Sequence, residues 1–146
     1  MVGVLVLLIF ASSELTIDVD RPLLPALSCV QAVLTGQGES IISVDEEQGV
    51  ITTGIRLVSP EALHRIAVTD RARTAIRWTR GFYQLTIALS PGEQGGTRVR
   101  ATARILGYGE SDLRLMRPSP WRPLASTGHL EAGILSAITA SCRVNP

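Results

Sequence analysis

The chain has 146 residues, of which 45% are apolar and 18% are charged, and its formal net charge is +1. This length predicts one domain with a sizeable core, and the composition excludes an intrinsically disordered chain and a collagen-like chain. Aromatic residues make up 4% of the sequence, so we expect a core built mainly from aliphatic side chains.

Residues 1–10 form the apolar run MVGVLVLLIF, and small residues follow it at Ala11, Ser12 and Ser13. The run is too short for a transmembrane helix, because about 20 residues are needed to span a bilayer. Its length is typical of the apolar part of a secretory signal, although the usual basic residues before it are missing. We therefore expect residues 1–13 to be a signal segment, with a buried first strand as the alternative.

The signal interpretation makes residues 14–146 the folded domain and places it in an oxidising compartment. A lipid anchor would need a Cys directly after the small residues, where the sequence has Ser12, Ser13 or Glu14. Lipid anchoring is therefore not supported by the sequence, and membrane association stays open.

The domain begins with a strand and a helix. Residues 15–20 read LTIDVD, in which every second side chain is apolar, and this alternation predicts a strand. Residues 23–34 space their apolar side chains as a helix does, with Pro25 in the first turn, where a missing N–H is harmless. The sequence TGQG at residues 35–38 then ends the helix.

Two short strands follow at residues 41–45 and 50–57, joined by a tight acidic turn. A Ser-Pro-Glu pattern opens a short helix or loop over residues 59–66. We expect residues 67–74 to be an exposed connection and Gly81 to be a β-bulge.

The strongest pattern in the chain is a long antiparallel hairpin between residues 83 and 105. Its arms read YQLTIALS and RVRATARI, and its loop holds one proline and three glycines. Alternation gives each arm one buried side and one solvent-facing side. The side chains predicted to point inward are Tyr83, Leu85, Ile87, Leu89, Val99, Ala101, Ala103 and Ile105.

After the hairpin, residues 106–109 are expected to end the sheet. Residues 110–124 contain three prolines and predict an irregular segment that Trp121 holds against the edge of the core. Ser126 or Thr127 is expected to cap a final helix. The apolar stripe of that helix consists of Leu130, Ile134, Ala137 and Ile138, with Leu135 at its margin.

The predicted elements follow the order β-α-β-β-β-β-α. An antiparallel sheet of about five strands, covered on one face by two main helices, is a two-layer sandwich of the α+β class.

Few residues in the sequence offer chemistry. Cys29 and Cys142 lie on different predicted helices, so they could form a disulfide if the helices pack side by side, or remain two small buried apolar residues. Two cysteines are too few for a four-ligand zinc site. We interpret His64 and His129 as surface residues. We therefore expect no catalytic, cofactor-binding or metal-binding residues, and we do not expect an enzyme.

Charge is distributed unevenly, with a net −6 in residues 1–50 and a net +7 in residues 51–146. Arg98, Arg100 and Arg104 share the outer face of one predicted strand. This row could meet anionic lipid or an acidic partner, or it could form a solvated face that blocks edge aggregation. We identify no aromatic residues interleaved with arginines on one face, so nucleic acid is not an expected partner.

The strand and helix at residues 15–34 are followed by three distinctive segments. These are SVDEEQGVITTGIR at residues 43–56, RGFYQLTIALSPGEQGGTRVRATARI at residues 80–105 and WRPLASTGHLEAGILSAI at residues 121–138. Together they resemble the lipoprotein module of the outer-membrane β-barrel assembly machinery, the BamC (NlpB) type, over most of residues 15–142. The chain departs from that pattern because it lacks the lipid-accepting Cys and a second copy of the module.

This resemblance implies a helix-grip α+β fold and a scaffold or interaction role without catalytic residues. It implies a Gram-negative envelope location, in the periplasm or at the periplasmic face of the outer membrane, with an envelope protein as the partner. A second resemblance is to the START/Bet v 1-like helix-grip fold, on the segment IDVDRPLLPAL at residues 17–27. That resemblance implies a carrier with a cavity for a small apolar ligand under the C-terminal helix.

Overall fold

The structure is a computed structural model that describes residues 15–69, 76–111 and 121–143. The predicted signal segment, residues 1–13, lies outside the described residues. Parts of the predicted connection at 67–74 and of the segment at 110–124 also lie outside them. The elements, in chain order, are β1 (Leu15–Val19), α1 (Leu23–Gly36), β2 (Ile41–Asp45), β3 (Val50–Thr53), β4 (Arg56–Val58), α2 (Pro60–Ile66), β5 (Ile76–Pro91), the short 3-10 turn η1 (Glu93–Gly95), β6 (Thr97–Ser111), β7 (Trp121–Leu124) and α3 (His129–Cys142).

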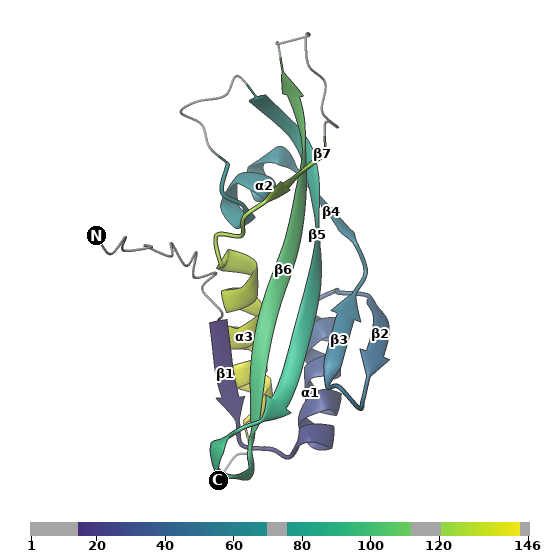
Figure 1. The fold of residues 1–146 in the computed structure, drawn as a ribbon, viewed down its shortest axis with the longest axis vertical. Helices are drawn as coiled ribbons and strands as arrows, with labels where there is room; N and C mark the ends of the chain where they lie inside the picture. The colour runs from purple at the N-terminus through teal and green to yellow at the C-terminus, as the bar shows by residue number, and fades with distance from the viewer. Residues whose placement is uncertain (1–14, 70–75, 112–120, 144–146) are drawn as a thin grey trace, which may run out of the picture.

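Over the residues that the structure describes, the fold is α+β, with a mostly antiparallel sheet of seven strands and three α-helices (Figure 1). The strand order is β1-β6-β5-β3-β2, while β4 also pairs with β5 and β7 also pairs with β6. The α+β class is therefore confirmed, but the prediction of about five strands is wrong. The predicted order of elements did not include β4 and β7 as separate strands, and it did not decide whether the segment that forms α2 is a helix or a loop.

The central hairpin is formed by β5 and β6, and it positions the rest of the molecule. Its register joins Tyr83 to Ile105 and Leu89 to Val99, and the predicted inward side chains are buried, except that Ala103 is partly buried. In Figure 1 this hairpin runs vertically, with α3 on one side of its lower half and α1 on the other. Alternating apolar side chains therefore predicted this part of the sheet correctly.

The helices cover one face of the sheet, which we call the inner face; the opposite face is the outer face. The buried side chains of α1 and α3 pack against the inner residues of β5 and β6. Leu63 of α2 lies against Gly81, which is on the same face. The core consists of side chains that are almost wholly buried, among them Val30, Leu34, Ile51, Leu63, Leu85, Ile87, Val99, Ile105 and Ile138.

The hairpin extends beyond residue 106, where the sequence had predicted that the sheet would end. The glycines responsible for that prediction make room for an aromatic ring. A Cβ atom at Gly107 would lie 2.8 Å from Cε3 of Trp78, and one at Gly109 would lie 3.0 Å from Cζ3 of the same ring. These glycines therefore make room for the indole of Trp78 next to β6, and the strand continues through both of them.

The predicted strand at residues 50–57 is divided into β3 and β4 because a side chain interrupts the ladder. The buried hydroxyl of Thr53 accepts a hydrogen bond of 2.9 Å from the backbone N–H of Leu85 and donates one of 3.3 Å to its carbonyl. Gln84 Nε2 donates to the carbonyl of Thr53 at 2.9 Å. At this point, side-chain hydrogen bonds therefore replace the backbone hydrogen bonds between β3 and β5. Threonine side chains are able to compete with sheet pairing in this way.

Two local predictions are wrong. The register of β5 shifts between Trp78 and Arg80, not at Gly81, which pairs regularly with Gly107. Glycine is required at position 81 because a Cβ there would lie 2.6 Å from Leu63 Cδ1. The prediction that Ser126 or Thr127 caps the final helix is also wrong, because the N-cap of α3 is Gly128, which has a φ of 86° and no side chain to cap the helix.

Candidate functional site

The predicted arginine row lies on the outer face of β6, as the alternation of the strand requires. Arg98, Arg100 and Arg104 are all exposed. Arg98 Nε lies 3.4 Å from Oδ1 of Asp18, which is its cross-strand neighbour on β1. Their side chains are 49% and 68% exposed, so solvent screens this ion pair and it adds little stability.

Aromatic side chains occupy the other end of the same face. The rings of Phe82 and Trp121 have centroids 5.1 Å apart, and those of Tyr108 and Trp121 are 5.2 Å apart. The guanidinium carbon of Arg80 lies 4.4 Å from the centroid of Tyr108 and 5.4 Å from that of Trp121. The expectation that no aromatic residues are interleaved with arginines on one face is therefore wrong, because Arg80 lies among these rings.

An apolar row crosses four strands beside this cluster. The register places Leu57 of β4 opposite Phe82, Phe82 opposite Leu106, and Leu106 opposite Pro123 of β7. Leu57 is 75% exposed, although it is a large aliphatic side chain. We use the name outer patch for six residues of this row and of the aromatic cluster. They are Leu57, Arg80, Phe82, Leu106, Tyr108 and Trp121.

A hydrogen-bonded network joins the inner face to the turn after α1. The Tyr83 hydroxyl donates to Oε1 of Glu39 at 2.6 Å, and Arg56 Nη1 donates to the same oxygen at 3.2 Å. Burial, followed by the hydrogen bond to Glu39, raises the pKa of Tyr83 to about 12. The phenol therefore stays protonated at neutral pH, and the network is a structural connection, not a source of a general base.

A second buried carboxylate closes a gap in the sheet. Along the edge of β6, β1 pairs as far as Ala101 and β7 begins pairing at Ile105, so Ala103 lies between them. Glu131 of α3 accepts a hydrogen bond of 3.2 Å from the backbone N–H of Ala103. It also accepts one of 2.8 Å from the hydroxyl of Ser126. The carboxylate thus accepts a hydrogen bond from a backbone N–H of β6 that lies between the described parts of β1 and β7.

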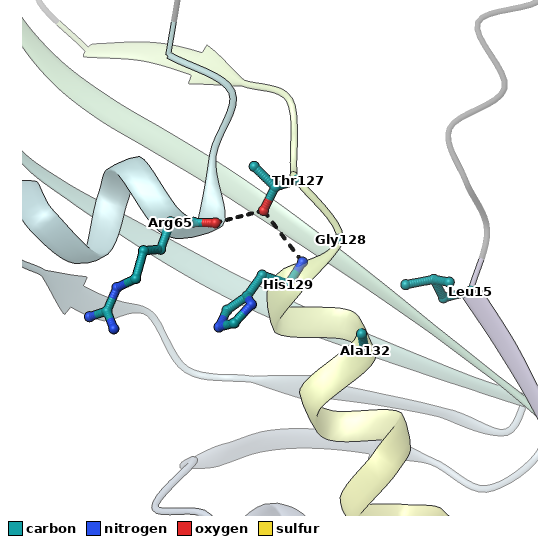
Figure 2. A pocket seen from close by; sticks show the side chains of 6 residues that line it. All are labelled: Leu15, Arg65, Thr127, Gly128, His129 and Ala132. Carbon is teal, nitrogen blue, oxygen red and sulfur yellow. Dashed lines mark hydrogen bonds between the residues drawn. The ribbon is translucent and has the colours of Figure 1, made fainter.

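A shallow pocket lies beside the first turn of α3 (Figure 2). Its volume is about 510 Å³, it opens to solvent, and it is lined by Leu15, Arg65, Thr127, Gly128, His129 and Ala132. The Thr127 hydroxyl donates to the carbonyl of Arg65 at 2.7 Å and accepts from the backbone N–H of His129 at 3.4 Å. Figure 2 shows the guanidinium of Arg65 pointing away from Thr127, and the Thr127 hydroxyl is already engaged by two backbone groups.

The two cysteines form a disulfide between α1 and α3. Cys29 and Cys142 are 113 residues apart in sequence, and their Cα atoms lie 5.8 Å apart. The sequence left open whether the two cysteines pair or remain two small apolar residues. In the structure α1 packs against α3, and this contact brings the cysteines together as a disulfide. Both histidines lie on helices, and Nδ1 of His64 is 2.7 Å from the hydroxyl of Thr69.

Within residues 15–69, 76–111 and 121–143, no three side chains of His, Cys, Asp or Glu are grouped as a metal site would need. None of the helices described in these ranges is long and apolar enough to cross a bilayer. Comparison with models of known protein families gives no match to the chain, and comparison with curated proteins gives none either.

Proposed function

We propose that this chain is a non-enzymatic interaction domain of the Gram-negative cell envelope, comparable in role to the BamC-type module that its sequence resembles. The observation that carries the proposal is the filled layer between the sheet and the helices. The inner residues of the hairpin meet those of α1 and α3 there, and Leu85, Ile87, Val30 and Ile138 have no exposed surface.

A carrier of a small apolar ligand would need an enclosed cavity in that same layer. The pocket beside α3 lies at the rim of the helix instead, opens to solvent, and includes Arg65 and His129 in its lining. The outer face, in contrast, presents the half-buried rings and aliphatic side chains of the outer patch. A packed core together with such a surface favours binding to a macromolecule over enclosing a small molecule.

The disulfide supports an extracytoplasmic location. Disulfides persist in oxidising compartments such as the periplasm and are rare where thiol reductants are abundant. The bridge joins α1 and α3, which pack against the inner face of the sheet, and ties them together covalently. This agrees with the interpretation of residues 1–13 as a signal segment, and we propose the periplasm as the location.

The buried polar groups support a role without catalysis. The carboxylate of Glu39 is occupied by Tyr83 and Arg56, and that of Glu131 by Ala103 and Ser126. Groups that complete structural hydrogen bonds in this way have little capacity left for proton transfer to a substrate.

The proposal is tested by three measurements on the full chain produced in a Gram-negative host. Cysteine alkylation in cells that are quenched with acid should leave Cys29 and Cys142 unlabelled, and cell fractionation should place the chain in the envelope fraction. Native mass spectrometry should show the mass of the polypeptide without a bound apolar molecule. Free thiols in the cytoplasmic fraction would contradict the location, and a lipid bound in a one-to-one ratio would favour the carrier.

A further inference from the structure

We propose that the outer face of the sheet binds an extended acidic segment of a partner protein, which anchors on the outer patch and follows the arginine row. The inference rests on the proposed function and adds the chemistry of the partner to it.

The first argument is the charge of the outer face. Along β5 and β6 the outer positions carry five arginines, which are Arg77, Arg80, Arg98, Arg100 and Arg104. The acidic side chain at the outer positions of these two strands is Glu110, opposite Arg77, and β1 adds Asp18 opposite Arg98. The face therefore keeps a net positive charge, and a partner that complements it carries carboxylates.

Five other acidic side chains of the described residues lie away from the outer positions of β5 and β6. Glu39 and Glu131 are buried on the inner face. Asp45, Glu46 and Glu47 lie at the turn between β2 and β3, where Oδ1 of Asp45 accepts hydrogen bonds from the backbone N–H groups of Glu47 and Gln48. Across the described residues, the outer positions of β5 and β6 therefore carry more arginines than carboxylates, and this excess favours an acidic partner.

The second argument is the composition of the outer patch. Trp, Tyr and Arg are the side chains that most often anchor protein interfaces. Arg80 lies over the rings of Tyr108 and Trp121, so its guanidinium is held in place before a partner arrives. A fixed guanidinium binds a carboxylate through two parallel hydrogen bonds, which lysine cannot do.

The shape of the hairpin favours an extended chain over a membrane. Tyr108 and Arg98 are ten residues apart on one strand, which corresponds to about 34 Å. A long two-stranded ribbon twists, and Figure 1 shows β5 and β6 crossing near the top of the view. The two ends of the outer face therefore do not share a plane, so a flat bilayer meets one end while an extended segment follows both.

The ring contacts disfavour nucleic acid. Binding of single-stranded nucleic acid depends on aromatic faces that are available for stacking with bases. Trp121 has the rings of Phe82 and Tyr108 at 5.1 and 5.2 Å, and Arg80 covers Tyr108. The rings of the outer patch are thus engaged with one another, which leaves the edges of the cluster for contact with a protein segment.

The test uses the full chain and four probes. These are a twelve-residue peptide that alternates glutamate with serine and carries two central leucines, the same peptide with lysine in place of glutamate, phosphatidylglycerol vesicles, and a twelve-nucleotide single strand. Fluorescence anisotropy measures affinity, and NMR amide shifts locate the contact. We expect the acidic peptide alone to bind, more weakly as salt rises, with shifts confined to β5, β6, β7 and β4.

Three charge-reversal variants then locate the site. Arg80→Glu and Arg104→Glu should each weaken binding of the acidic peptide about tenfold or more, while thermal unfolding stays close to that of the parent chain. Arg65→Glu is the matched control, because Arg65 is exposed on α2, and it should leave the affinity unchanged.

Several outcomes would overturn the inference. Equal binding of the lysine peptide, equal loss in the Arg65→Glu variant, or shifts centred on the helices would show that the outer face is not the acidic-segment site. Binding of vesicles or of the oligonucleotide without the acidic peptide would assign the face to a membrane or to nucleic acid. If the acidic peptide does not bind to a chain that is oxidised and free of ligand, this inference is wrong, while the proposed function is unaffected.

Discussion

The hydroxyl of Tyr83 donates a 2.6 Å hydrogen bond to Oε1 of Glu39, which fastens the central strand β5 to the turn after α1. The carboxylate is almost wholly buried, with a side-chain exposure of 5%, and Arg56 is its charged partner. A buried carboxylate is costly unless its hydrogen bonds are made, so each of the two donors should contribute measurably to stability.

Replacing Tyr83 with phenylalanine should destabilise the fold by about 1–3 kcal/mol, because the buried carboxylate of Glu39 loses one of its two hydrogen-bond donors. Urea unfolding measures the difference. Tyr108→Phe is the matched control, since Tyr108 lies half-buried on the outer face, and it should change stability by less than about 0.5 kcal/mol. Equal effects of the two variants would contradict the role of the Tyr83–Glu39 bond.

The same residue should make the fold sensitive to alkali. The pKa of Tyr83 is raised in the folded state from 10.0 to about 12, so folding favours the protonated phenol. Its contribution is complete below pH 10 and is lost as pH rises from 10 towards 12, up to about 2 kcal/mol. Unfolding free energy measured across this range should fall more steeply for the parent chain than for Tyr83→Phe. Parallel curves would contradict the assignment.

Removing the disulfide should be the most costly single chemical change. The bridge closes a loop of 113 residues between Cys29 and Cys142, and a bridge of this span contributes about 3–5 kcal/mol through the unfolded chain. The Cys29→Ala/Cys142→Ala variant should lose that amount in urea unfolding. The reduced parent chain should behave like the double variant, and a difference between them would show that the alanines disturb the packing of α1 on α3.

Glu131 should be replaceable by glutamine but not by alanine. Glutamine keeps an oxygen that can accept from the N–H of Ala103, whereas alanine leaves that N–H without its acceptor. Glu131→Ala should therefore cost about 1–3 kcal/mol, and Glu131→Gln clearly less. Amide hydrogen exchange at Ala103 should accelerate in the alanine variant. An unchanged rate there would mean that the carboxylate does not protect this part of the edge.

Two glycines should respond to alanine with opposite signs. A Cβ at Gly107 would lie 2.8 Å from Trp78 Cε3 and from Leu124 Cδ1, so Gly107→Ala should destabilise by about 1–3 kcal/mol. Gly133 lies within α3 with no atom within 4 Å of an added Cβ. Gly133→Ala should stabilise by up to about 1 kcal/mol. Thermal unfolding of both variants checks the pair.

The sequence predicted the hairpin well because its information is local. Alternating side chains identify a strand whatever it pairs with, and the inward set from Tyr83 to Ile105 is buried as predicted. Strand β7 was missed because Trp121-Arg122-Pro123-Leu124 contains a proline. Pro123 pairs with Leu106, and proline is tolerated in an edge strand such as this one.

The outer patch and the disulfide could not be predicted, because both depend on distant parts of the chain. Leu57, Phe82, Leu106 and Pro123 become one row only when the registers of four strands are known. Cys29 and Cys142 meet only when α1 and α3 lie side by side, which helical periodicity does not reveal. The arginine row was recognised, but its aromatic neighbours were not, because Trp121 was placed in an irregular segment.

The long span of the Cys29–Cys142 bridge also sets the order of events in biogenesis. The sequence holds two cysteines, so within one chain an oxidising enzyme has a single pairing to make and no incorrect isomer to repair. Cys142 leaves the ribosome 113 residues after its partner, so the thiol of Cys29 must wait until almost every strand has emerged. Covalent closure within one chain can therefore occur only after the whole segment between the two cysteines has been synthesised.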